Sequence, residues 1–199
     1  MIRKALHGPE QQSMTYPYVH PLHVLNLAHE VNVRIVVPSV VYCLSMYHLD
    51  DLLRGDHAKL KIKHPSLPSS QIFPSDLKDY TLMFQYRLNT LLDFVHRVCG
   101  NRIAEADCLA GKSPCNRRFV KLASRIGRSW TTKTNVLYLM VQVIEELSED
   151  AELCHVCRKA FFRDIRLVRD EIWAHLPVVV GLPSWKELET IDLSFSSCK

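Results

Sequence analysis

The sequence lacks the motifs that would place it in a well-defined functional class. It contains no HExxH motif, no glycine-rich phosphate loop, and no serine or cysteine nucleophile in a defined motif. It also has no apolar run long enough for a signal-peptide core or a membrane span. These absences predict a non-catalytic protein of the cytoplasm or nucleus, with neither a membrane nor a small molecule as its partner.

An excess of charge of one sign is also missing. Lys and Arg number 25 against 21 Asp and Glu, which gives a formal net charge of +4 at pH 7. A dedicated nucleic-acid binder is usually more basic than this. The apolar fraction of 47% and the charged fraction of 23% are ordinary for globular proteins and argue against disorder. We therefore expect a folded chain, and its net charge does not identify its partner.

What the sequence does contain is helical periodicity. Apolar residues recur every three or four positions from Ser75, the expected N-cap, to Gly100, and again from about Cys154 to an expected stop at Pro177. Residues 136–144 are almost entirely apolar, and a β-strand is the competing interpretation, but the segment continues past normal strand length. The pattern predicts an all-α fold, an irregular bundle of about six to eight helices with a cysteine cluster as a candidate staple.

Proline, glycine and serine mark the expected boundaries between segments. Asn32 and Gly55 offer left-handed helix stops, and residues 57–74 contain prolines, serines and a short basic run. The predicted segments are a flexible lead-in at 1–19, a helical segment at 20–56, a linker at 57–74, a helical domain at 75–188 and a tail at 189–199.

Two pairs of cysteines are the strongest candidates for a functional site. Both pairs lie at expected helix starts that follow irregular segments: Cys108 and Cys115 precede a short helix, and Cys154 and Cys157 form a CxxC pair. Zinc prefers four tetrahedral ligands, and a helix start lowers the pKa of a thiol and so favours the ligating thiolate. The sequence therefore predicts one structural zinc ion on these residues.

Other interpretations of the cysteines stay open. The spacing between Cys108 and Cys115 is wider than in a usual zinc knuckle, and this favours unligated thiols. Cys99 or His155 could take the place of one ligand, whereas Cys43 and Cys99 are expected to be small core residues. A redox pair would need a neighbouring βαβ pattern, which is missing.

A basic helix face gives a second functional hypothesis. Five cations recur on the short helix after Cys115, and they could contact phosphates, although such a face is more often simply solvated. These residues are Arg117, Arg118, Lys121, Arg125 and Arg128. A zinc-stapled module that contacts nucleic acid is the alternative function, and nucleic acid is the less favoured partner.

Short motifs in the chain resemble the region that follows the BTB/POZ domain in a large group of fungal proteins. They are CHVCR at 154–158, RDEIWAHLP at 169–177, GLPSW at 181–185, and the segments 20–28 and 36–42, where Val41 replaces a small residue. The resemblance covers about residues 20 to 188 and implies that 20–56 is BACK-like and that the BTB domain itself is absent. It also implies a non-catalytic interaction scaffold with an unidentified protein partner, and in that group the two cysteine pairs recur in comparable places.

Overall fold

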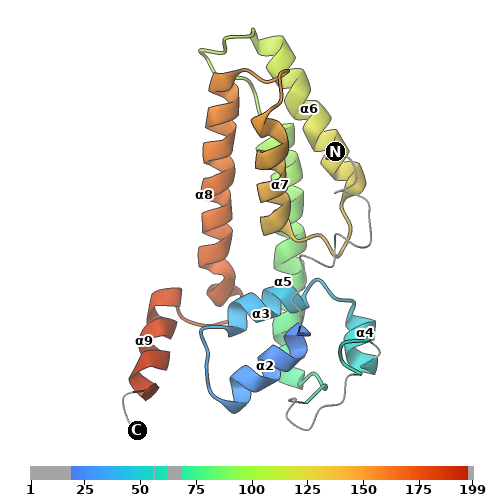
Figure 1. Ribbon diagram of the computed structural model, residues 1–199, viewed down its shortest axis with the longest axis vertical. Coiled ribbons are helices and arrows are strands. Elements are labelled where there is room, and N and C mark those ends of the chain that lie inside the picture. The colour runs from blue at the N-terminus through green and yellow to red at the C-terminus, as the bar shows by residue number, and fades with distance from the viewer. Residues whose placement is uncertain (1–18, 56, 62–68, 197–199) are drawn as a thin grey trace. The chain divides into compact units, whose positions relative to one another are not determined.

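The computed structural model describes residues 19–55, 57–61 and 69–196. Within these residues it contains eight α-helices, one π-helical segment and no strand. Figure 1 labels the α-helices along the chain. This confirms the predicted all-α bundle, and the helical interpretation of residues 136–144 is confirmed with it. Residues 1–18 of the predicted lead-in lie outside the described residues.

The helical elements follow one another in this order along the chain. They are α2 (Pro21–Glu30), α3 (Val37–Leu44), α4 (Leu49–Arg54), α5 (Pro74–Asp93), the π-helical segment η2 (Phe94–Gly100), α6 (Lys112–Ser129), α7 (Val136–Ser148), α8 (His155–Val179) and α9 (Trp185–Ser196).

The chain divides into two compact units, which we call unit 1 (Met1–Met83 with Leu176–Lys199) and unit 2 (Phe84–His175). The divisions fall within α5 and α8, because each of these helices runs from one unit into the other. The described ends of the predicted linker, by contrast, belong to unit 1. The side-chain amide of Asn26 in α2 donates to Ser69 O at 2.5 Å and to Gln71 O at 3.1 Å. The linker residues 62–68 lie outside the described residues.

Unit 1 is held together by an apolar core and a few polar contacts. The Tyr80 hydroxyl donates to Tyr47 O at 2.9 Å, and the Asp192 carboxylate accepts from the backbone N–H of Ile35 at 2.8 Å, which ties α9 to the start of α3. The fully buried core side chains include Leu22, Leu25, Leu44, Met83, Leu176 and Leu188.

The helices of unit 2 pack against one another through apolar residues that line one face of each helix. In α6 the buried residues recur at intervals of three and four, which places them on one face. Phe119 of α6 meets Phe161 of α8 edge to face, with ring centroids 5.1 Å apart. Helix α6 lies beside η2 at Gly127, where an added Cβ would meet Val95 Cγ1 at an ordinary van der Waals distance of 3.8 Å. The packing brings the starts of α6 and α8 into reach of one loop.

Three helix boundaries differ from the predictions. Helix α5 begins at Pro74, so Ser75 lies within its first turn instead of capping it. Helix α8 runs through Pro177 to Val179, so Pro177 does not stop it. Residues 185–196 form α9, where the sequence suggested the end of a domain and a tail.

The stop of α8 comes from Gly181 instead of Pro177. Leu182 N donates to Pro177 O at 2.9 Å and Gly181 N donates to Val178 O at 3.0 Å, which is the bonding pattern of a Schellman motif. Gly181 has φ +70°, a conformation that favours glycine. The same pattern ends α2, where the predicted stop at Asn32 is confirmed by its φ of 52°.

Candidate metal centre

Three segments of unit 2 deliver the four cysteines that the sequence singled out. Cys154 is the N-cap of α8, and Cys157 lies in its first turn. Cys115 lies in the first turn of α6, and Cys108 comes from the loop that precedes α6. The thiols thus meet where two helix N-termini and one loop converge, in keeping with the expectation of helix-start ligands. Cys108 alone is not at a helix start.

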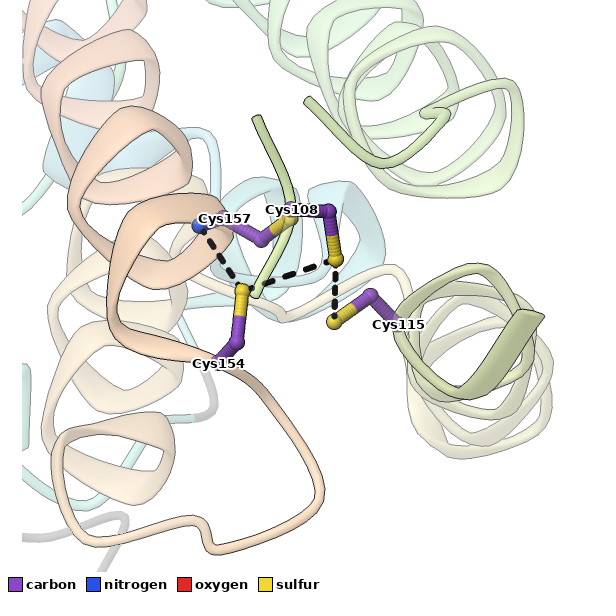
Figure 2. A group of neighbouring side chains, drawn as sticks. All are labelled: Cys108, Cys115, Cys154 and Cys157. Carbon is purple, nitrogen blue, oxygen red and sulfur yellow. Dashed lines mark hydrogen bonds between the residues drawn. The ribbon is translucent and has the colours of Figure 1, made fainter. Parts of the chain in front are cut away.

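The four sulfur atoms form one compact group. All of them lie within 4.8 Å of one another. Cys108 Sγ is 3.6 Å from Cys115 Sγ and 3.6 Å from Cys154 Sγ, and Figure 2 shows these three side chains pointing toward one another. Cys115 and Cys157 are fully buried, whereas Cys108 and Cys154 are half-buried. The arrangement is compatible with a metal site whose ligands Cys115 and Cys157 face the core while Cys108 and Cys154 are partly exposed to solvent.

Polar contacts hold the loop that carries Cys108. Arg102, which is 11% exposed, pairs with Asp164 of α8 at 2.8 Å and lies over the Phe161 ring, 5.0 Å from its centroid. Asn116 of α6 accepts from the backbone N–H of Ala104 at 2.6 Å. Sequence reasoning missed Arg102 and Asn116, because nothing in their local pattern marks them. They fix the loop to both helices and so place Cys108 beside the other thiols.

Backbone N–H groups already supply hydrogen bonds to the sulfurs. Glu105 N donates to Cys157 Sγ at 3.4 Å, and Cys157 N donates to Cys154 Sγ at 3.5 Å. The second bond is the capping bond of α8, with sulfur in the place of the usual hydroxyl or carboxylate oxygen. Such donors stabilise thiolates, whether bound to a metal or free.

The thiols differ in how readily they lose a proton. Burial raises the pKa of Cys154, but hydrogen bonds from the backbone of Cys157 and Leu109 and from neighbouring thiols outweigh it and lower the pKa to about 6. Burial raises the pKa of both Cys115 and Cys157. The group therefore resembles one thiolate surrounded by thiols that donate to it.

Three residues considered earlier lie outside this group. Cys99 is fully buried in η2, and burial raises its pKa to about 12, as expected of a small core residue. Cys43 is half-buried in α3, so it is less enclosed than predicted. His155 is exposed and is not among the residues that could share one ion with the four cysteines.

The basic face of α6 is largely occupied by ion pairs within unit 2. Arg118 binds Asp150 with an Nε to Oδ2 distance of 2.6 Å, and Arg125 binds Glu146 at 2.6 Å. Lys121 pairs with Glu152 at 3.3 Å in a more exposed position. Three of the five cations proposed to contact phosphates are thus matched by carboxylates at the end of α7 and just beyond it.

Unit 2 also has an open groove of about 640 Å³ between α5, η2 and α8. The Tyr86 ring lies beside His175 there, with centroids 5.4 Å apart, and Asp93 pairs with Arg97 at 3.3 Å. Burial raises the pKa of Tyr86, which makes it a weaker acid. The groove has no cysteine among its lining residues and is separate from the candidate metal centre.

Comparisons with known proteins add no assignment. No protein-family model matches the chain, no curated protein matches it in sequence, and no solved structure matches it. None of the helices in the described part of the chain has both the length and the apolarity needed to cross a membrane.

Proposed function

We propose that Cys108, Cys115, Cys154 and Cys157 bind one zinc ion that joins the loop before α6 to the starts of α6 and α8. The observation that carries this proposal is the approach of all four sulfurs to within 4.8 Å of one another. Thiolates at about 2.3 Å from a tetrahedral zinc ion lie about 3.8 Å from each other. The two separations of 3.6 Å are close to that value.

The compactness of the group favours a single ion over a cluster. An iron–sulfur cluster spreads its cysteine ligands over several irons, which needs more space between the sulfurs than one ion does. Zinc thiolate sites also need reduced cysteines, and this supports a location in the cytoplasm or nucleus.

The proposed role is that of a non-catalytic scaffold that binds another protein. A zinc ion with four protein thiolates has no open position for a substrate or water, so its contribution is structural. The resemblance to the helical region after a BTB/POZ domain supports the same role. The ion pairs of Arg118, Lys121 and Arg125 argue against the alternative, in which the α6 face contacts nucleic acid.

The zinc proposal is tested by measuring metal per purified chain. We expect about one zinc ion per chain in the wild type and almost none after Cys157→Ser, because loss of one of four ligands opens a site that lacks a replacement. Cys43→Ser is the matched control, since Cys43 is a thiol of unit 1 outside the group. The proposal would be disproved if the wild type is purified without metal and melts at the same temperature as Cys157→Ser.

The scaffold role is tested by co-purification of the tagged full chain from its native cells. We expect a protein partner to be recovered with the wild type and with Cys43→Ser, and less of it with Cys157→Ser. Failure to recover any protein, both with this chain and with a BTB/POZ domain placed before residue 20, would count against the role. Recovery of nucleic acid that is released by moderate salt would support the alternative instead.

A further inference from the structure

Helix α8 carries a second basic surface that the sequence analysis did not single out. His155, Arg158, Lys159, Phe162 and Arg166 recur at intervals that place them on one helix face, and they line a pocket of about 190 Å³. We call this surface the α8 face. It lies in unit 2 and begins beside the candidate metal centre, since His155 stands between Cys154 and Cys157.

The α8 face differs from the α6 face in its charge balance. Three nearby carboxylates already pair with other cations: Asp150 and Glu152 with cations of α6, and Asp164 with Arg102 and Arg163. Asp170 is exposed one turn beyond Arg166. Within the described part of the chain, Lys159 and Arg166 form no ion pair, and both are exposed. The cations Lys159 and Arg166 of the α8 face are therefore unpaired among the described residues, whereas three of the five cations of the α6 face are paired.

Arg158 is held in place at the edge of the pocket. Its Nη1 donates to Ser148 O at 2.8 Å, at the end of α7. Carbonyl oxygens hold the Arg158 guanidinium in place without neutralising its charge. Its Nε and Nη2 make no hydrogen bond to the residues that the structure describes, so they remain available as donors. An anion that binds these donors would meet a side chain that has already lost much of its freedom.

Phe162 gives the same pocket an apolar part. Its side chain is half-buried and lines the pocket together with Arg158, Lys159 and Arg166. A site with cations around an aromatic ring fits a segment that has carboxylates on either side of an apolar residue. A chain of phosphates would leave the apolar contact unused.

The length of the face also favours a short peptide over a nucleic acid. From His155 to Arg166 the helix rises about 16 Å. Exposed acidic residues stand beyond both ends of this stretch, Glu152 before it and Asp170 after it. They would repel a polyanion that continues past the pocket, whereas a short acidic segment ends within it.

We propose that the α8 face docks an acidic peptide segment of a partner protein, with its carboxylates on Arg158, Lys159 and Arg166 and an apolar side chain against Phe162. This inference rests on the proposed scaffold function and names the chemistry of the partner. The proposed zinc ion would hold the start of α8, and with it the docking face, in a fixed position.

The test is fluorescence anisotropy with the full, zinc-loaded chain and a labelled peptide. The probe is a peptide of about five residues with two glutamates on each side of a central leucine, which when extended spans about 16 Å and so matches the length of the face. We expect Lys159→Glu combined with Arg166→Glu to weaken binding by at least about tenfold. Phe162→Ser should weaken it several-fold while leaving its salt dependence unchanged, because Phe162 carries no charge.

The matched control is Arg128→Glu combined with Lys133→Glu, which changes the net charge by the same amount. Both residues are exposed and lie outside the α8 face, at the end of α6 and in the loop that follows. Binding by this control should stay close to that of the wild type. Equal losses in the two double variants would overturn the inference, because general charge attraction would then explain the binding.

Two further outcomes also overturn the inference. One is tighter binding of a short DNA duplex than of the peptide, with the same loss on Lys159→Glu and Arg166→Glu, which would identify a phosphate site. The other is failure of the peptide to bind at all. In that case the zinc content and the recovery of a protein partner, measured separately, still decide the proposed function.

Discussion

At the scale of single residues, chemical type was easier to predict than position. The four thiols could be picked out because cysteine is rare and its uses in a reducing compartment are few. Arg87 could not. Arg87 is completely buried and donates to Thr132 O at 2.6 Å and to Thr134 O at 2.7 Å. The apolar pattern of α5 does not predict a buried residue at this position. Its partners come from a loop far along the chain, so no local pattern reveals them.

Arg118 and Asp150 should be strongly coupled in stability. Their side chains are only 14% and 12% exposed and are joined through two guanidinium nitrogens. A double-mutant cycle with Arg118→Ala and Asp150→Ala, measured by urea unfolding, should give a coupling free energy of about 1 to 3 kcal/mol.

Lys121 and Glu152 are the matched control for this cycle. Their side chains are 63% and 61% exposed, so solvent screens the pair. Their coupling free energy should be about 0.5 kcal/mol or less. Equal coupling in the two cycles would show that burial does not set the strength of the Arg118 pair.

His20 should make the stability of unit 1 depend on pH. Burial, followed by the nearby His57, His23 and Lys59, lowers the pKa of His20 to about 3. Unfolded histidine titrates near pH 6.5, so the unfolded state binds the proton first as pH falls. Stability is therefore full above about pH 6.5 and is lost progressively toward pH 3, by an amount on the order of a few kcal/mol.

His20→Asn separates this effect from the role of His20 as an N-cap. The His20 Nδ1 accepts from Leu22 N at 3.1 Å, and asparagine can accept the same bond without titrating. Unfolding measured by circular dichroism from pH 7 to 5.5 should show a smaller loss of stability in His20→Asn than in the wild type. The same pH dependence in both proteins would show that other groups dominate.

At the scale of elements, the existence and type of the helices were predictable, and some of their ends were not. The stops at Asn32 and Gly55 follow from residues that tolerate positive φ. Pro177 misled the prediction because its missing N–H and its ring act on the turn before it, while its fixed φ is helical, so the chain can continue for two more helical residues to Val179. The π-helical turn at Phe94–Gly100 has no sequence signal that we can identify.

Gly181→Ala should test the assigned stop of α8. A Cβ added at Gly181 would meet no atom within 4 Å, so the cost is the φ of +70° alone. We expect a loss of about 1 kcal/mol in the free energy of unfolding.

Gly127→Ala is the control for the same type of substitution. It lies inside α6, where a Cβ would meet only Val95 Cγ1 at an ordinary 3.8 Å. It should leave stability unchanged or raise it by up to about 1 kcal/mol, because alanine is a better helix former. Destabilisation at Gly127 equal to that at Gly181 would refute the conformational explanation.

At the scale of the whole molecule, the sequence could predict that thiols meet but not which parts of the chain form a unit. The predicted boundary at 57–74 followed proline and charge, whereas the two units divide within α5 and α8. A helix that continues through a boundary keeps its periodic pattern there, so composition does not change at the point of division. The described ends of the linker instead bind α2 through Asn26.

Removal of the proposed zinc ion should loosen unit 2 locally while leaving unit 1 intact. The loop before α6 keeps its contacts through Arg102 and Asn116 without a metal, so we expect local opening and not global unfolding. Limited trypsin digestion with and without a chelator measures this, because Lys112 is exposed at the junction of that loop and α6. Cleavage after Lys112 should accelerate by about tenfold for each 1.4 kcal/mol of lost local stability.

Lys186 in α9 provides the control site, since it is exposed and belongs to unit 1. Its cleavage rate should not respond to the chelator. Equal acceleration at both sites would mean that the ion stabilises the entire chain, and unchanged rates at both would mean that no ion holds the loop. A response confined to Lys112 is expected only when metal-bound thiols join that loop to the starts of α6 and α8, because contacts through Arg102 and Asn116 do not depend on a metal.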